Sequence, residues 1–312
     1  MGNMLANFCI PVKDNETLYN VAMKAILLKS RKILGNVLVL AVLAALVFAV
    51  WSAAAKPVES GLYVRFLSVG QGDAELIQTP SHGNILIDGG PDSTVLTELD
   101  KFMPFYGRNI DAIVLTHPHA DHVAGLVSVL SKYQVKSAYI SGVTYTTSEY
   151  LEFLNLLKSK NVATKDVKAG DRLDLGNNVS LEFLFPLTSE VGKSLDNINN
   201  GSVVTKLKYG HEAALFMGDL EAEAQGALLA SRQDVRSALY KVPHHGSKDS
   251  INSDFLASVH PLYAVIEVGK DNKFGHPAAS ALTALFGVRV FRTDQEGTIS
   301  FEIGEDEIKR VK

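Results

Sequence analysis

Three short histidine clusters are the residues of this chain whose types and spacing most clearly predict chemistry. His117-Pro-His119-Ala-Asp121-His122 directly follows the apolar stretch Ala112–Leu115 and opens the next predicted helix. Three imidazoles and a carboxylate this close repel one another when protonated and lose hydration when buried, and metal ligation relieves both costs. His117 and His119 can reach one metal ion, and Asp121 and His122 can reach a second. Because two ions about 3.5–4 Å apart can hold a hydrolytic water between them, the spacing predicts a dinuclear metal site.

Further candidate ligands follow other predicted strands. Asp219 ends one apolar strand beside a glycine, where a carboxylate is placed to bridge two metals. His244 and His245 follow the next strand in the sequence His-His-Gly-Ser, and His276 lies in a loop after a third. Asp88 ends an earlier apolar strand, and we expect it to orient the histidine loop from behind rather than to bind metal. Functional side chains collect at such strand ends, so we expect these groups to meet.

The elements that must position these groups alternate between strand-like and helix-like patterns. We expect strands at 61–69, 74–79, 84–87, 112–115, 135–140, 179–185, 202–209, 213–217, 239–242, 262–268, 288–291 and 298–303. We expect helices at 93–105, 123–133, 150–158, 221–230, 250–259 and 278–286. This order favours a mixed α/β sandwich over a doubly wound sheet. No linker divides residues 61–305, which we interpret as one domain. His82, His211 and His260 lie in turns without a partner pattern, and we interpret them as structural or solvated.

An uncharged stretch, residues 33–55, precedes this domain. A helix of that length measures about 34 Å, enough to cross a hydrocarbon core of roughly 30 Å. Basic side chains precede it and Lys56 alone follows, which predicts residues 1–32 in the cytoplasm and the domain outside. The alternatives are a signal peptide and a buried core helix. Ala53 and Ala55 form an Ala-x-Ala pattern, and Met23 would then be the start. Both the anchor and the signal peptide export the domain.

Composition excludes several classes of protein. The chain has 312 residues, of which 46% are hydrophobic and 21% charged, so it is neither disordered, collagenous nor a coiled coil. Its single cysteine, Cys9, excludes a disulfide within the chain. Residues 1–56 hold six of the 30 basic and two of the 34 acidic side chains, which leaves the remainder with a net charge of −8. This charge does not indicate a nucleic-acid partner, although a local basic groove or bound divalent ions can override it.

Together these motifs resemble the metallo-β-lactamase superfamily, and within it the extracellular hydrolase domain of the ComEC-type competence proteins, the DNA-uptake channels of bacteria. The similarity is carried by residues 66–74, 84–91, 115–122, 199–204, 218–219, 241–248, 275–277 and 292–294. It implies an αββα sandwich, preceded here by one N-terminal transmembrane helix, with a dinuclear site at the edge between the two sheets. The chain has one membrane segment instead of a multi-helix channel, so we do not expect a direct role in DNA import.

The resemblance has one departure at the site. Most members carry a further histidine before the bridging aspartate, but residues 196–202 read Asp-Asn-Ile-Asn-Asn-Gly-Ser. The resemblance therefore implies that one of His244 and His245 completes the first site, as in the similar phosphorylcholine esterases of the bacterial surface. The other would face the substrate as an acid or a phosphate contact. The implied ligands are His117, His119 and one of His244/His245 for the first ion, Asp121, His122 and His276 for the second, and Asp219 as the bridge.

The function implied is that of a metal-dependent hydrolase at the bacterial cell membrane, or a secreted one if the N-terminal segment is cleaved. Its substrate would be a phosphodiester: DNA, a choline-bearing cell-wall polymer or a small molecule. We expect two divalent ions, with Zn favoured over Mn, and Asp121 as a base that orients the attacking water. Candidate phosphate contacts are Asn199, Asn200, Ser247, Lys248 and Lys273. The alternatives are hydrolysis of a lactone, thioester or β-lactam, and a non-catalytic accessory role in a surface or DNA-uptake complex.

Overall fold

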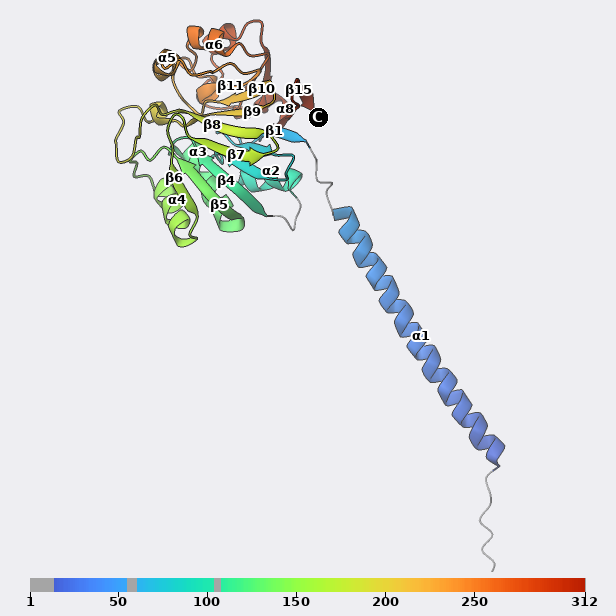
Figure 1. Ribbon diagram of the computed structural model, residues 1–312. Helices are drawn as coiled ribbons and strands as arrows, with labels where there is room; N and C mark the ends of the chain where they lie inside the picture. The colour runs from blue at the N-terminus through green and yellow to red at the C-terminus, as the bar shows by residue number, and fades with distance from the viewer. Residues whose placement is uncertain (1–13, 55–60, 104–107, 312) are drawn as a thin grey trace, which may run out of the picture. The chain divides into compact units, whose positions relative to one another are not determined.

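The structure is a computed structural model that describes residues 14–54, 61–103 and 108–311 (Figure 1). It divides into two compact units, residues 1–55 and 56–312. The predictions that concern Cys9, Ala55 and Lys56 lie outside the described residues.

The first unit is one long helix, α1 (Asn15–Ala54), which begins well before the uncharged stretch predicted at residues 33–55. Its large apolar side chains are exposed to solvent in the absence of a lipid phase. Over Asn15–Val50 the helix is long and apolar enough to cross a membrane, so it is a candidate transmembrane span. A signal sequence near the N-terminus can meet the same criteria of length and composition, which alone do not distinguish the two.

The second unit contains two sheets packed face to face, which confirms the predicted αββα sandwich. The first sheet has the order β15-β14-β1-β2-β3-β4-β5-β6. Its strands are β1 (Leu62–Phe66), β2 (Glu75–Gln78), β3 (Asn84–Ile87), β4 (Asn109–Leu115), β5 (Gln134–Ile140), β6 (Ala163–Asp166), β14 (Ile299–Ile303) and β15 (Ile308–Val311). The last of these extends the sheet beyond the domain limit predicted at residue 305.

The second sheet has the order β13-β12-β11-β10-β9-β8-β7. Its strands are β7 (Arg172–Gly176), β8 (Val179–Phe185), β9 (Val204–Tyr209), β10 (Glu212–Phe216), β11 (Leu239–Lys241), β12 (Tyr263–Ile266) and β13 (Arg289–Arg292). Strands β10, β11 and β12 run parallel to one another, as do β3 and β4 in the first sheet. Because parallel strands end at one edge, the segments that follow them come together there.

Helices cover the outer face of each sheet (Figure 1). The helices of the first sheet are α2 (Thr94–Phe102), α3 (Ala120–Lys132) and α4 (Ser148–Ser159). The helices that follow β10 and later strands are α5 (Ala222–Ala230), α6 (Ser253–Val259), α7 (Ala279–Ala284) and α8 (Thr293–Glu296). Two 3₁₀ turns complete the described elements, η1 (Ile198–Gly201) and η2 (Pro243–Gly246).

The period-two alternation of the strands explains the layers. Along β4, Ala112 and Val114 face the core between the sheets, whereas Ile113 faces the helices. A third apolar layer joins the second sheet to its helices, where Leu215 and Phe255 are fully buried. The central strands of both sheets are therefore buried on two faces, whereas the edge strands β6 and β7 are largely exposed.

Candidate metal centre

Hydrogen bonds of the residue that follows β3 join the ends of β3 and β4 in the first sheet. The backbone N–H of Asp88, directly after β3, donates to the carbonyl of Val114 on β4. Thr116 donates its backbone N–H and its hydroxyl to the two carboxylate oxygens of Asp88, at 2.8 and 2.6 Å. The chain then turns at His117 and His119, and His119 is the N-cap residue of α3. The carboxylate of Asp88 thus fixes the start of the histidine segment.

Helix α3 places Asp121 and His122 in its first turn and packs directly on the loop after β3. A Cβ added at Gly125 would lie 1.7 Å from the carbonyl oxygen of Gly89, so a side chain has no room at that position. The backbone N–H of Gly89 donates to the carbonyl of His122 at 2.8 Å. This close packing fixes the position of the first turn of α3, and with it the positions of Asp121 and His122.

The second sheet supplies its groups from the ends of β10 and β11. Asp219 follows β10 and is buried, and its backbone N–H donates to the hydroxyl of Ser202 at 3.2 Å. His244 and His245 lie in η2 after β11, with φ angles of 48° and 53°. Left-handed backbone at two successive non-glycine residues costs on the order of 1–3 kcal/mol each, and such strain is concentrated at functional sites. Here it directs two consecutive imidazoles to the same carboxylate.

Four imidazoles surround one oxygen of Asp219. The distances from Asp219 Oδ2 to the Nε2 atoms of His117, His122, His244 and His245 are 3.9, 3.4, 3.8 and 3.8 Å. Donors that share a metal ion at about 2.1 Å lie roughly 3–3.5 Å from each other. The spacing is therefore close to that of donors around shared ions.

The remaining two members of the histidine-aspartate motif join the same group. The Nδ1 atom of His119 lies 3.0 Å from Nε2 of His117. Oδ2 of Asp121 lies 3.3 Å from Nε2 of His245 and 4.0 Å from Nε2 of His122. The structure thus brings together seven of the predicted ligands, namely His117, His119, Asp121, His122, Asp219, His244 and His245.

The opposite ring nitrogens of three of these histidines face protein oxygens. His122 Nδ1 lies 2.7 Å from Asp88 Oδ2, and His244 Nδ1 lies 3.4 Å from Glu221 Oε1. His245 Nδ1 lies 2.9 Å from the carbonyl of Glu267. Such contacts fix the tautomer and leave Nε2 available, and they are the usual companions of metal-binding histidines.

The pKa shifts and the unpaired buried atoms of this group of histidines and aspartates favour bound cations. Burial lowers the pKa of His117 well below its usual value, whereas His245, although buried, has its pKa raised to about 10 by Asp219 and Asp73. Nε2 of His122 and Oδ1 of Asp219 are buried and have no hydrogen-bond partner among the described residues. Unpaired buried donors and acceptors are costly, and a divalent ion would satisfy both. The His and Asp clusters are thus suited to a dinuclear metal site.

His276 takes a different position from its predicted neighbours. Its ring centroid lies 5.8 Å from that of His244 and 6.2 Å from that of His245, in contact with both. Its Nδ1 atom faces the amide nitrogen of Gln71 at 3.5 Å. One set of ligand atoms that all lie within 4.8 Å of one another comes from Asp121, His122, Asp219 and His245. His276 belongs to no such set among the described residues, and neither do His117, His119 and His244.

The predicted phosphate contacts divide into buried and exposed residues. Asn199 is buried and donates to Glu221 Oε1 at 3.0 Å, while Asn200 Oδ1 accepts from the backbone N–H of Glu221 at 3.3 Å. Asn199 therefore holds the carboxylate that faces His244, and Asn200 holds the backbone of the same residue. Ser247 is buried as well, whereas the side chains of Lys248 and Lys273 are exposed.

Sequence reasoning missed a buried ionic network behind the centre. Lys241 and Asp73 form an ion pair with both side chains fully buried, and Asp73 Oδ1 lies 3.2 Å from Nδ1 of His245. Glu75 and Glu267 are also buried there, and the pKa of Glu267 is raised to about 8 by burial and by Asp73. The Gln-Gly-Asp and Lys-Val-Pro-His segments were visible in the sequence, but no spacing rule connects residues so far apart.

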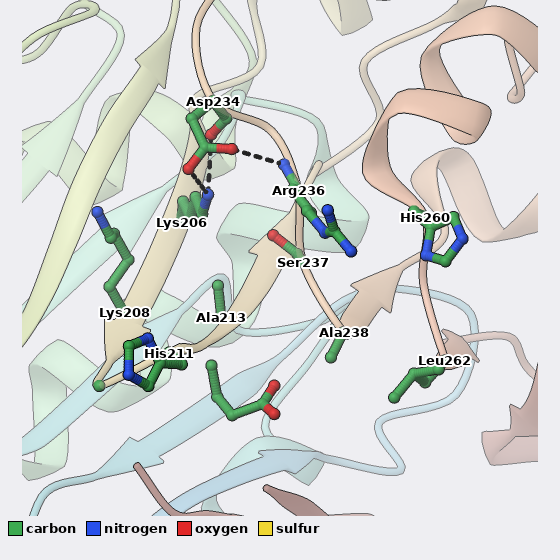
Figure 2. A pocket seen from close by; sticks show the side chains of 12 residues that line it. Lys206, Lys208, His211, Ala213, Asp234, Arg236, Ser237, Ala238, His260 and Leu262 are labelled. Carbon is green, nitrogen blue, oxygen red and sulfur yellow. Dashed lines mark hydrogen bonds and ion pairs between the residues drawn. The ribbon is translucent and has the colours of Figure 1, made fainter. Parts of the chain in front are cut away.

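A separate pocket of about 370 Å³ lies at the opposite ends of β10 and β11 (Figure 2). The buried ammonium of Lys206 is held there by Asp234 at 2.8 Å. His211 and His260 line this pocket, and both are exposed, in agreement with their interpretation as solvated. The pocket shares no residue with the metal centre.

Comparison with known proteins shows that the chain is similar to bacterial competence proteins. The chain is 29% identical over 257 residues to ComE operon protein 3 of Bacillus subtilis and 26% identical over 260 residues to competence protein ComA of Neisseria gonorrhoeae. These matches cover 76 and 80% of this chain but 32 and 34% of the relatives, so the chain spans about a third of their length.

Among solved structures, CmlA, a diiron beta-hydroxylase from Streptomyces venezuelae, has a similar fold, with a TM-score of 0.51 at 13% identity. The similarity covers 80% of this chain and 55% of that chain. Residues 67–266, well over half of the chain, match the metallo-beta-lactamase superfamily. The chain therefore belongs to the metallo-β-lactamase superfamily.

Proposed function

We propose that the protein is a metal-dependent phosphodiester hydrolase held at the outer face of a bacterial cytoplasmic membrane. The observation that carries this proposal is the set of four imidazole Nε2 atoms around Asp219 Oδ2. The position of His244 in that set supports it as the donor that replaces the histidine absent from residues 196–202. The inferred orientation is based on the basic residues that precede the apolar stretch of α1.

Our ligand assignment gives each histidine of the His244-His245 pair one ion. His117, His119 and His244 would hold the first ion, Asp121, His122 and His245 the second, and Asp219 would be shared. The 3.3 Å contact between His245 and Asp121 supports this division. It departs from the sequence-based expectation, which placed His276 in the second site and left the roles of the pair open.

Metal ions held by these residues would supply Lewis-acid polarisation of a phosphoryl oxygen and of a water molecule. The residues of the chain orient the reactants. The side chain of Asp121, about a third exposed, is open to solvent and can accept the proton of the attacking water. His276, adjacent to the group and half-buried, remains available as an acid or a phosphate contact. Zn is our first choice of metal and Mn the second, and the diiron centre of CmlA adds iron to the candidates.

The preference for a phosphodiester is based on the charges around the histidines. Lys248 directly follows the His244–Ser247 turn, and Lys273 lies in the loop that carries His276, so exposed cations border the site. Cations at this position favour an anionic substrate over a neutral lactone, thioester or β-lactam. The competence relatives are consistent with DNA as one such substrate.

The test is a substrate screen with the full chain in detergent. The protein is stripped with a chelator, reloaded with Zn, Mn or Fe, and assayed on single- and double-stranded DNA, bis(p-nitrophenyl) phosphate, a phosphorylcholine ester, a lactone and a β-lactam. We expect metal-dependent turnover of a phosphodiester that is lost in Asp219→Ala and retained in the control Asp306→Ala, a turn residue between β14 and β15. Turnover of the lactone or β-lactam alone would overturn the proposal.

A further inference from the structure

Four aromatic rings follow one another from the metal centre to the surface, each tilted by about 30° from the next. His122 and His245 have centroids 5.7 Å apart with planes at 31°, and His245 and His276 are 6.2 Å apart at 29°. Phe274 continues the series beyond His276 at 5.8 Å and 27°. His122 is fully buried, whereas Phe274 is 59% exposed. The series thus ends in a phenylalanine ring that is largely open to solvent.

The loop that presents Phe274 is held in place by hydrogen bonds. Asn272 Oδ1 accepts from the backbone N–H groups of Phe274 and His276 at 3.2 and 3.0 Å, and Asn272 Nδ2 donates to the carbonyls of Gly269 and His276. The N–H of Gly269 donates to Gln71 Oε1 at 3.0 Å, which joins this loop to the first sheet. The backbone that carries Phe274 is therefore held before any ligand arrives, so a ligand need not order this loop in order to bind.

Packing within the domain does not explain why this residue is aromatic. Large exposed apolar side chains of the second unit's described residues also include Leu262, Leu282 and Phe286, but Phe274 is the one stacked on a histidine of the site. Lys273 Nζ lies 5.5 Å from the Phe274 ring centroid, so the ring carries a cation beside it. A flat ring next to a cation is suited to a ligand that combines an aromatic group with a phosphate.

We propose that Phe274 is a specificity-determining residue, a stacking surface for a flat aromatic group, such as a nucleobase, attached next to the reacting phosphate. The inference rests on the proposed function, which places the reacting phosphate at the metal centre. The new element is the chemical class of the group attached to that phosphate. The site would then prefer nucleoside phosphodiesters to alkyl ones such as choline esters.

The experiment compares thymidylyl-thymidine with glycerophosphocholine, two phosphodiesters with alkoxide leaving groups. Stacking of a base on an aromatic side chain contributes about 1–3 kcal/mol. Phe274→Leu should therefore lower kcat/KM for the dinucleotide between roughly 5- and 150-fold, mainly through KM, and leave glycerophosphocholine within about twofold. Phe274→Tyr should retain the preference. The matched control, Phe286→Leu, alters a phenylalanine that is 94% exposed and should change neither rate.

Binding gives a readout that does not depend on turnover. Calorimetry with thymidine monophosphate and phosphorylcholine on the metal-loaded chain should show the same selective loss in Phe274→Leu. Equal effects on both ligands, or none, would overturn the inference and leave phosphodiester hydrolysis standing. If the wild-type chain hydrolyses neither ester and no phosphodiester of the substrate screen, the proposed function fails, and the difference in binding still decides the role of Phe274.

Discussion

Nε2 of His122 lies 3.4 Å from Oδ2 of Asp219, and the segments that carry these two side chains follow strands of different sheets. His122 belongs to the first turn of α3, and Asp219 follows β10. The contact therefore joins the two halves of the sandwich, and each half alone would hold an incomplete group of donors. Integrity of the centre depends on the packing of one sheet against the other.

Substitution of the shared carboxylate should have a larger effect than loss of a carboxylate behind it. Asp219→Ala removes a donor that both ions would share, so we expect lower occupancy of both metals and no turnover. Asp88→Ala removes the partner of His122 Nδ1, and metal affinity should fall by roughly 10–100-fold. Metal analysis after dialysis against graded chelator measures both effects. Two retained metals and full activity in Asp219→Ala would contradict the dinuclear assignment.

The two adjacent histidines should behave alike, whereas His276 should differ. Because His244 and His245 are assigned to different ions, each alanine variant should lose about one metal per chain. His276→Ala should keep both metals and lose rate, by about 10²–10⁴-fold if the imidazole acts as a general acid. Metal content and rates on one phosphodiester check this prediction.

The asparagine loop supplies a control for the histidine variants. Asn200→Ala should keep both metals, because its amide contacts the backbone of Glu221 rather than the group. Metal loss in His276→Ala with two metals in His245→Ala would restore the sequence-based assignment of the second site.

The sequence predicted the sandwich well because its central strands are buried on both faces. Apolar runs such as Ala112–Leu115 and 179–185 stand out for that reason. The edge strands β6 and β7 were missed, because β6 reads Ala-Thr-Lys-Asp and is fully exposed, so no apolar alternation marks it. Pairing with a neighbour creates such a strand, and pairing is not visible in a local pattern.

The candidate ligands were also predicted from the sequence, but the arrangement of His244, His245 and His276 around Asp219 was not. Left-handed backbone at His244 and His245 points two consecutive imidazoles at one carboxylate, which neither strand nor helix periodicity would produce. In our proposed assignment, that turn lets His245 take the place in the second site that the sequence predicted for His276. The partners Glu221 and Asp73 escaped notice because only the fold brings them to the histidines.

Loss of the buried lysine behind the centre should destabilise the metal-free protein. Lys241→Met removes one of the two cations that face the buried carboxylate of Asp73 and leaves His245 as its remaining partner. Loss of one partner from a buried ion pair costs about 3–5 kcal/mol in free energy of unfolding, and we expect a loss up to that size. The double variant Lys241→Met/Asp73→Asn removes both charges and should recover a large part of that loss. Urea unfolding in the presence of chelator measures the two values. Equal stability of the single variant and the wild-type chain would show that the pair makes no net contribution.

The last prediction concerns the orientation of the chain in the membrane. Lys24, Lys29, Arg31 and Lys32 precede the uncharged stretch of α1, and this bias predicts that the N-terminal side stays in the cytoplasm. A reporter that works only outside the cytoplasm should be active when fused after Lys312, and protease added to intact protoplasts should remove the domain. Replacing the four basic residues with glutamate removes the bias, so it should lower reporter activity, while replacing four basic residues of the domain surface should not. A domain protected in protoplasts would place the centre in the cytoplasm and exclude extracellular substrates.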